Sequence, residues 1–410
     1  MPNFALDMNS SSSRNSLLAA VALAGLLVYV LACASFSPDD SKVAVPAFDA
    51  RTGEFGITVF HRKTARLTPV FSFSVLKSLA EPSYEAQLLR AQWLDNQRLI
   101  VAWPGGEGSS KGDSKTINLL LLLEEGKGAV RCWQIPEVEE LAGKMARPLA
   151  VAGSRLFMSV DSNLVARLDL ETGQVVSHLC RGEAIELYPS GHKDFVFYTA
   201  SLPGESNKVE VGKLDAATFA QTTLQHVESV RTHGRTLSDV LGTPLAFSAD
   251  GRQVAMVSDN DDPCLLRIAR SGQAEQSILL SAGDERLQLG GLCFSPRGDL
   301  VFASFARETK TETNVTFGVL TVPLDGRPAR RTLLFTGPEK ADRDSVVYLQ
   351  PGLSHDGKTL ALASTYLFGD PDQHMRNPSD CALYLVDVSK TPHRVRKVTL
   401  PLPRPDHPFK

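Results

Sequence analysis

Short segments of alternating hydrophobic residues recur along the chain, and a tight polar turn precedes each one. Proline presets the backbone angle at the start of such a turn, aspartate bonds back to its own backbone, and glycine accepts a positive φ. A turn of this kind between two alternating segments predicts a β-hairpin. The clearest copies of the turn are residues 36–42 (FSPDDSK), 247–252 (FSADGR), 294–299 (FSPRGD) and 353–358 (LSHDGK).

Weaker copies of this turn lie at residues 93–98, 151–155 and 188–193, which brings the total to seven. A second turn class follows downstream in several copies, at residues 49–53, 169–173, 215–218 and 324–326. Each copy therefore predicts four strands, A to D. The first turn class joins A to B and the second mostly joins C to D, but residues 49–53 join B to C in the first copy.

The spacing of the copies predicts the fold class. About 370 residues after Ala34 divided by seven gives about 53 residues per copy, close to the period of propeller blades. The sequence therefore predicts an all-β protein, a β-propeller of seven four-stranded blades preceded by one hydrophobic helix. Six or eight blades remain open, and two stacked β-sandwiches are the alternative architecture.

The turns and strands of this repeat resemble those of the TolB-like and WD-repeat-like β-propellers of bacteria. The resemblance covers most of the chain after Ala34, and it implies the fold rather than a function. No copy keeps a whole Ser-Pro-Asp-Gly turn, and no Trp-Asp dipeptide closes a blade. TolB itself implies a soluble periplasmic protein with a further N-terminal domain. This chain has no room for that domain, so the TolB role is not carried over.

Residues 17–34 (LLAAVALAGLLVYVLACA) carry no charge and are long enough to cross a bilayer as a helix. Arg14 before them and acidic residues after them favour an inside N-terminus and an extracytoplasmic body. Three fates are open: a retained signal anchor, cleavage after Ala34, or lipidation of Cys33 in a lipobox at residues 30–33. The predicted organisation is a polar leader (1–16), a transmembrane or signal segment (17–34), the propeller (35–402) and a tail (403–410).

Composition narrows the function classes. A hydrophobic content of 43%, a charged content of 22% and a net charge of −3 are ordinary globular values, which exclude a largely disordered chain and offer no broad basic field for nucleic acid. The six cysteines are dispersed, and the glycine-rich residues 104–112 lack the Gly-Lys-Ser/Thr ending of a phosphate loop. The sequence therefore predicts no catalytic residue, no cofactor and no metal site.

Long predicted B–C loops at residues 104–115, 306–314 and 366–380 lie on the face opposite the short turns, and long loops on a rigid scaffold commonly bind partners. The leading hypothesis is a non-enzymatic, membrane-anchored cell-envelope scaffold, extracytoplasmic or periplasmic, that binds an unidentified protein or ligand. The alternative is a lactonase- or glycosidase-like hydrolase with Asp259, Asp370, Asp372 and His374 near the central channel. The candidate binding residues are Trp103, Asp259, Asp261, Tyr366, Phe368, Asp370, Asp372 and His374.

Overall fold

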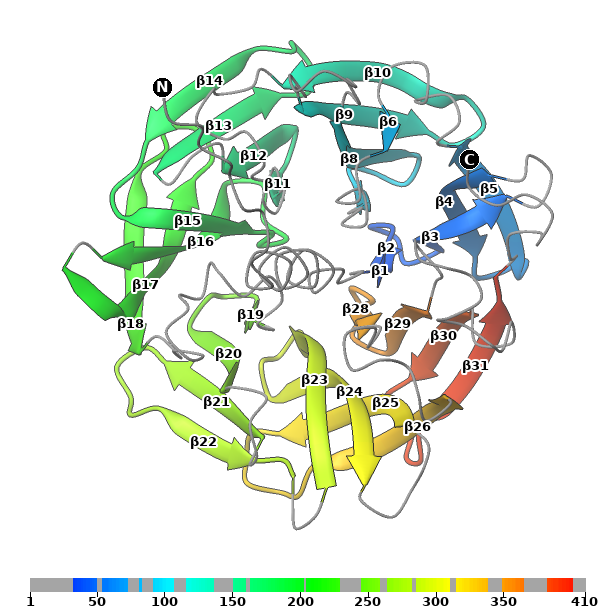
Figure 1. Ribbon diagram of the computed structural model, residues 1–410, viewed down its shortest axis with the longest axis vertical. Helices are drawn as coiled ribbons and strands as arrows, with labels where there is room; N and C mark the ends of the chain where they lie inside the picture. The colour runs from blue at the N-terminus through cyan, green and yellow to red at the C-terminus, as the bar shows by residue number, and fades with distance from the viewer. Residues whose placement is uncertain are drawn as a thin grey trace, which may run out of the picture.

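Seven sheets stand side by side around a central axis (Figure 1). Each sheet is antiparallel, and its strands follow one another in sequence order from the innermost to the outermost, so the chain is a seven-bladed β-propeller. The computed structural model describes residues 32–49, 54–72, 81–82, 91–106, 116–135, 150–159, 163–202, 204–228, 245–258, 264–281, 285–309, 315–337, 349–364 and 382–400.

The first three blades follow the predicted order. Blade 1 comprises β2 (Ser35–Phe36), β3 (Lys42–Asp49), β4 (Glu54–His61) and β5 (Arg66–Ser72). In blade 2 the innermost position is divided between two short strands that both pair with β8, and its members are β6 (Glu81–Pro82), β7 (Ala91–Trp93), β8 (Arg98–Gly106), β9 (Thr116–Glu124) and β10 (Gly128–Ile135). Blade 3 comprises β11 (Ala150–Ala152), β12 (Arg155–Ser159), β13 (Leu164–Asp169) and β14 (Val175–Leu179).

The remaining four blades are regular. Blade 4 comprises β15 (Glu183–Tyr188), β16 (Phe195–Leu202), β17 (Glu205–Asp215) and β18 (Gln221–Glu228). Blade 5 comprises β19 (Leu245–Phe247), β20 (Gln253–Ser258), β21 (Leu265–Arg270) and β22 (Gln276–Leu279). Blade 6 comprises β23 (Glu285–Phe294), β24 (Leu300–Thr309), β25 (Val315–Pro323) and β26 (Arg330–Gly337). Blade 7 comprises β28 (Gly352–Leu353), β29 (Thr359–Ser364), β30 (Ala382–Asp387) and β31 (Arg394–Thr399).

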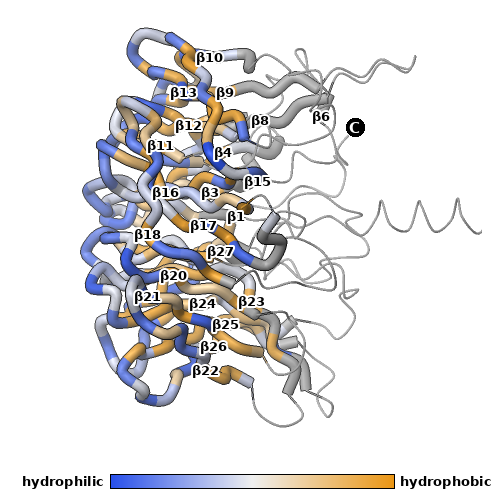
Figure 2. Tube along the Cα trace, turned by 90° about the vertical axis from the view of Figure 1, so that its left-hand side faces the viewer, coloured by the Kyte–Doolittle hydropathy of each residue, from blue (hydrophilic) through white to orange (hydrophobic). Residues whose placement is uncertain are grey.

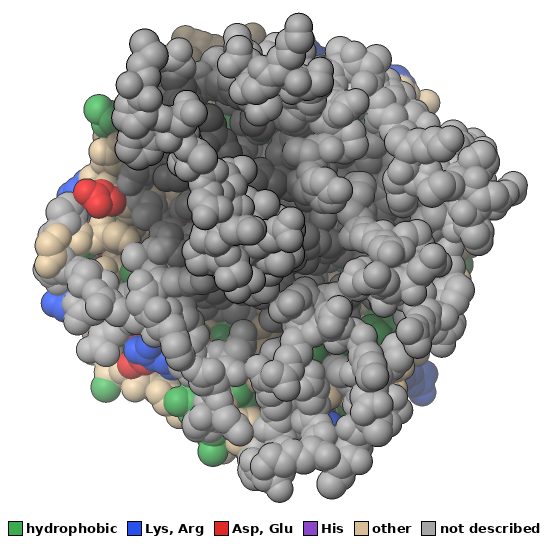
Figure 3. Space-filling view, in the orientation of Figure 1, with side chains coloured by type: hydrophobic (Ala, Val, Ile, Leu, Met, Phe, Trp, Pro, Cys, Tyr) green, Lys and Arg blue, Asp and Glu red, His purple; other side chains and the backbone are tan. Residues whose placement is uncertain are grey.

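The core fills the spaces between blades. Strands B and C are rich in Val, Leu, Ile, Ala and Phe, and their side chains alternate between the two neighbouring blades. One continuous hydrophobic cluster contains Val43 of blade 1, Leu121 of blade 2 and Leu383 of blade 7. The outermost strands are more exposed, as at Leu179 (67% exposed) and Leu333 (60%), and the described side chains visible at the rim in Figure 3 are of mixed hydrophobic, acidic and basic character.

The ring closes without exchange of a strand between the first and last blades, because each blade is one continuous stretch of chain. A separate parallel pair holds the junction, with β1 (Ala32–Cys33) against β27 (Leu349–Gln350). A side chain at Gly352 would collide with the carbonyl oxygen of Ala34. The chain immediately after the hydrophobic segment is therefore built into the closure.

The predicted turns are confirmed. The first class joins A to B in all seven blades, and the second joins C to D in blades 3, 4 and 6. In blade 1 the B strand β3 ends at Asp49 and the C strand β4 begins at Glu54, while residues 50–53 lie outside the described ranges. These A–B and C–D turns form one hydrophilic side of the disc (Figure 2). One boundary differs from prediction: β8 continues through Pro104 to Gly106, because Gly105 and Gly106 pair with both Glu81–Pro82 and the start of β9.

Within the described ranges, no helix is both long and apolar enough to cross a bilayer. Residues 1–16, residues 17–31 of the hydrophobic segment and the tail from residue 401 lie outside those ranges.

Candidate functional site

A buried serine organises the A–B turns. In the four clearest copies its hydroxyl donates to an aspartate of the same turn at 2.7 Å, and it accepts the first backbone N–H of the next strand at 2.9–3.1 Å. These serines are only 0–6% exposed, so their hydroxyls are shielded from water and depend on these partners. The sequence analysis did not assign this role, although the recurrence of the serine is a visible signal. The four residues are Ser37, Ser248, Ser295 and Ser354.

Asp40 departs from the repeat and takes on a distinct role. It has a φ of 57° at the turn position where blades 5, 6 and 7 carry glycine. Its carboxylate accepts the backbone N–H of His355 at 2.8 Å and that of Asp356 at 3.0 Å, and one of its oxygens lies 2.9 Å from Nδ1 of His355. Arg62 donates to the Asp40 carbonyl at 2.8 Å and to Thr359 Oγ1 at 2.9 Å. Blade 1 is thereby clamped to blade 7.

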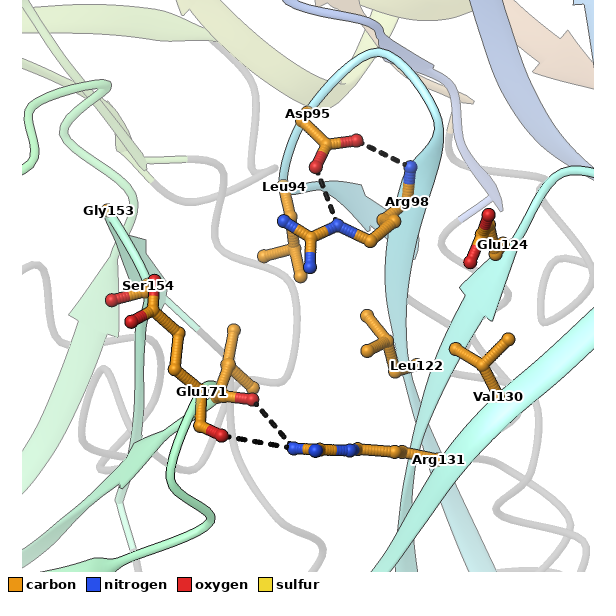
Figure 4. A pocket seen from close by; sticks show the side chains of 11 residues that line it. Leu94, Asp95, Arg98, Leu122, Glu124, Val130, Arg131, Gly153, Ser154 and Glu171 are labelled. Atoms are coloured by element: carbon orange, nitrogen blue, oxygen red, sulfur yellow. Dashed lines mark hydrogen bonds and ion pairs between the residues drawn. The ribbon is translucent and has the colours of Figure 1, made fainter.

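A pocket of about 430 Å³ lies on the turn side between blades 2 and 3 (Figure 4). Arg131 of β10 crosses the gap and donates to the carbonyl oxygens of Leu170 and Glu171 at 3.3 and 3.2 Å. Asp95 and Arg98 form an ion pair at 2.6 Å beside it. The pocket is therefore polar, and its two arginines already have partners within the protein.

An equivalent pocket of about 540 Å³ lies between blades 5 and 6. Gln253 donates to the Gly298 carbonyl at 2.9 Å and accepts from Arg270 at 3.1 Å. The ion pair between Arg327 and Asp325 measures 2.8 Å. Both pockets arise from the same repeat geometry and lie between the turns of neighbouring blades.

The carboxylates of the turns serve as hydrogen-bond acceptors. The backbone N–H of Thr172, followed by its hydroxyl, lowers the pKa of Asp169, and Thr218 lowers the pKa of Asp215 in the same way. For Asp39, burial opposes ionisation, but hydrogen bonds from neighbouring serines outweigh it and lower the pKa to about 2. A carboxyl group with a lowered pKa is a poor general acid at neutral pH, so these aspartates stabilise turns.

One buried ionised group lies inside blade 4. Glu210, with a side chain 4% exposed, accepts hydrogen bonds from Tyr198 Oη and from Arg181, the latter at 2.8 Å. Burial opposes the ionisation of Glu210, but the bonds from Tyr198 and Arg181 outweigh it and lower its pKa. Burial, followed by the bond to Glu210, raises the pKa of Tyr198. The Glu210 carboxylate thus receives its hydrogen bonds from Tyr198 of the same blade and from Arg181, which immediately precedes that blade.

The predicted binding-face residues fall mostly beyond the described ranges. Trp103 lies in strand β8, opposite Leu119, so it is a strand residue and not a loop residue as predicted. Strand β20 ends at Ser258 and strand β29 ends at Ser364; both are B strands, so both end on the side opposite the A–B turns. The other candidates lie outside the described residues: Asp259, Asp261, Tyr366, Phe368, Asp370, Asp372 and His374.

The described part of the chain offers neither a metal-binding cluster nor, at Cys180, a reactive thiol. Its His, Cys, Asp and Glu residues form no group of three that could hold a metal ion. Burial raises the pKa of Cys180 to about 11, which leaves the thiol protonated and weakly nucleophilic at neutral pH.

Comparison with known proteins finds similarity to solved structures only. No protein-family model matches the chain, and no curated protein sequence matches it. Solved structures that resemble it include the Mitotic Checkpoint Complex (14% identity, 83% of this chain and 86% of that chain, TM-score 0.47) and the Myceliophteria thermophila Cps50 (Swd1) β-propeller domain (14%, 74% and 84%, TM-score 0.40). An oligogalacturonate lyase in complex with manganese is also similar (13%, 75% and 75%, TM-score 0.45).

The strand order and pairing of the seven sheets define the chain as a seven-bladed β-propeller. At these identities the likeness extends to the fold alone, and no activity, ligand or partner passes from those proteins to this chain.

Proposed function

We propose that this protein is a non-enzymatic cell-envelope scaffold, anchored by residues 17–34, that binds a protein or ligand through its long-loop face. The observation that carries the proposal is how the described carboxylates of the turn side are used. Asp169 and Asp215 hold backbone N–H groups of their own turns, and Asp40 holds two of blade 7. This side of the ring is therefore devoted to holding the blades together, and the opposite side is left for recognition.

The closure supports retention of the hydrophobic segment. Cleavage after Ala34 would remove both residues of β1, and cleavage before Cys33 would remove half of it. Either cut would also release the residues that bring the Ala34 carbonyl against Gly352. An uncut segment keeps β1 paired with β27, which favours a signal anchor over the two processed forms.

Affinity purification of the full-length, tagged protein from the membranes of cells that make it tests the scaffold role. The control is a variant in which residues 366–380 are replaced by a Gly/Ser segment of equal length. We expect a reproducible partner with the native chain and its loss with the variant. Hydrolysis of lactones or glycosides by the purified protein, with no partner recovered, would favour the enzyme instead.

Intact-mass analysis of the same preparation tests the anchor. Retention requires a mass that includes residues 17–34. A mature chain that begins at Cys33 with attached acyl groups, or at Ser35, would contradict retention while leaving the scaffold role to the affinity experiment.

A further inference from the structure

Positive charge is concentrated in one sector of the rim. The outer halves of blades 6, 7 and 1, defined as strands C and D with the turn between them (residues 315–337, 382–400 and 54–72), contain ten Lys and Arg against three Asp and Glu. The equivalent described residues of blades 2, 3 and 4 (116–135, 163–179 and 204–228) contain five against eight. A chain with a net charge of −3 therefore carries a sector of +7, which both ends of the sequence build together. Strands β26, β31 and β5 follow one another along this stretch of the rim (Figure 1).

Strand β31 is the most basic strand of the sector. Three of its six residues are basic, namely Arg394, Arg396 and Lys397, and all three are exposed. Among the described strands β31 pairs only with β30. It is thus an outer edge, whose backbone N–H and C=O groups on one side are available to another strand.

Both faces of β31 carry positive charge. The Arg396 guanidinium lies 5.5 Å from the centre of the Phe60 ring in blade 1, on one side of the strand. The Lys397 ammonium lies 5.8 Å from the centre of the Tyr384 ring in blade 7, on the other side. These contacts hold the Arg396 side chain toward blade 1 and the Lys397 side chain over Tyr384, its cross-strand neighbour on β30. Val395, on the same face as Lys397, is 40% exposed and adds apolar surface to the strand.

The acidic residues of the outer halves of blades 6 and 7 are already engaged. Asp387 pairs with Lys390 at 2.8 Å, and Asp325 pairs with Arg327 at 2.8 Å. Asp325 and Asp387 are the only acidic residues of these two outer halves. These two carboxylates therefore do not neutralise the basic side chains of β31, whose positive charge is available to a partner.

From this arrangement we infer that β31 docks an extended acidic segment of a partner protein, which adds to blade 7 as a fifth strand. Backbone hydrogen bonds to the edge supply the pairing, and carboxylates at every second residue of the incoming strand lie on one face, where they meet Arg394 and Arg396. Lys397 on the other face adds to the positive potential of the edge. This surface is distinct from the long-loop face, and the inference does not rest on the function proposed above.

A protective role is the competing explanation for a charged edge, since like charges prevent edge-to-edge association of identical chains. Protection requires charge of either sign on any exposed edge. It does not account for the gathering of one sign on three adjacent blades, and it predicts no affinity for an added acidic strand.

Fluorescence anisotropy with labelled peptides distinguishes the two explanations. The probe is a ten-residue peptide of alternating Thr and Glu, added to the full-length protein in a neutral detergent. The control peptide alternates Pro and Glu, which keeps the charge but removes backbone donors from half of its positions. We expect binding of the first peptide that weakens as salt is raised, and at least tenfold weaker binding of the second.

Matched variants locate the site. Arg394→Glu/Arg396→Glu should weaken binding of the Thr/Glu peptide at least tenfold, because two attractive cross-strand pairs become repulsive. Lys127→Glu/Lys193→Glu makes the same change in net charge on blades 2 and 4 and should leave binding within about twofold. Hydrogen exchange should show new protection of the β31 amides on addition of the peptide.

Three results would overturn the inference: equal binding of the two peptides, equal effects of the two double variants, or unchanged exchange at β31. Binding only to vesicles that contain phosphatidylserine, with no binding of the Thr/Glu peptide, would assign the sector to an anionic membrane and would equally refute docking of a strand.

Discussion

Replacement of Asp40 by glycine tests whether this carboxylate closes the ring. Three contacts join the carboxylate to His355 and Asp356 at 2.8–3.0 Å. Hydrogen bonds to a charged group contribute about 1.5–3 kcal/mol each when buried. Here the Asp40 side chain is 13% exposed and that of His355 is 60% exposed, so about 1 kcal/mol for each contact is a reasonable value.

The substitution also relieves the left-handed backbone at residue 40, which restores about 1 kcal/mol. The net loss of unfolding free energy is therefore about 2 kcal/mol, and the thermal midpoint should fall by roughly 2–3 °C, because the unfolding entropy of a chain this long is large. Differential scanning calorimetry measures it on the full-length protein. Hydrogen exchange at β1 and β27 should rise in the same variant, because their pairing lies at the same junction.

Asp325→Asn is the matched control, since Asp325 belongs to a turn that makes no contact with the closure and bonds Arg327 of its own turn. We expect its midpoint to change by less than about 1 °C, as for most surface substitutions. An unchanged midpoint for Asp40→Gly, or equal losses in the two variants, would refute the assignment of Asp40 as the clamp.

Three further predictions concern packing, ionisation and thiol reactivity. Gly251 and Gly191 both have a positive φ, but a side chain at Gly251 would overlap the Phe197 ring whereas one at Gly191 meets open space; Gly251→Ala should therefore destabilise by about 1–3 kcal/mol more than Gly191→Ala in denaturant titrations. The pKa of Glu210 is lowered from 4.5, so its contribution is fully present above the unfolded-state pKa and is lost as pH falls through the folded-state value; the stability difference between the native protein and Glu210→Gln should shrink below about pH 4.5 and stay constant near neutrality. Burial raises the pKa of Cys180 to about 11, so peptide mapping should find this thiol little alkylated by iodoacetamide at pH 8 until the protein is unfolded, and rapid alkylation of the folded protein would contradict its burial.

Local turn chemistry is the part of this fold that sequence predicts well. Residues such as Gly251 and Asp169 act within a few positions of themselves, so a short window contains the cause of each turn. Seven such turns at a regular spacing then leave few architectures other than a propeller. The division into strands A to D followed directly, including the unusual B–C position of residues 49–53.

Contacts between distant segments were not predictable in the same way. The pairing of β1 with β27 involves two residues on each side, too few to carry a pattern. The sequence assigned no separate role to Asp40, and only its proximity to His355 reveals one. Trp103 was a candidate binding residue next to the predicted loop at residues 104–115, yet pairing with β9 extends the strand through Gly106. The other predicted binding residues, from Asp259 to His374, stay predictions.

The positions of the three tryptophans give the ring a built-in fluorescent reporter. All three tryptophans belong to blade 2, in strands β7, β8 and β10. The indole N–H of Trp93 bonds the Ser35 carbonyl of blade 1 at 2.8 Å, so its emission registers the seam between these two blades. Circular dichroism averages over the strands of every blade, whereas tryptophan emission reports on the surroundings of blade 2 alone. Coincident melting curves from the two signals would mean that the ring unfolds as a single unit, and an earlier emission change would mean that it opens first beside blade 2.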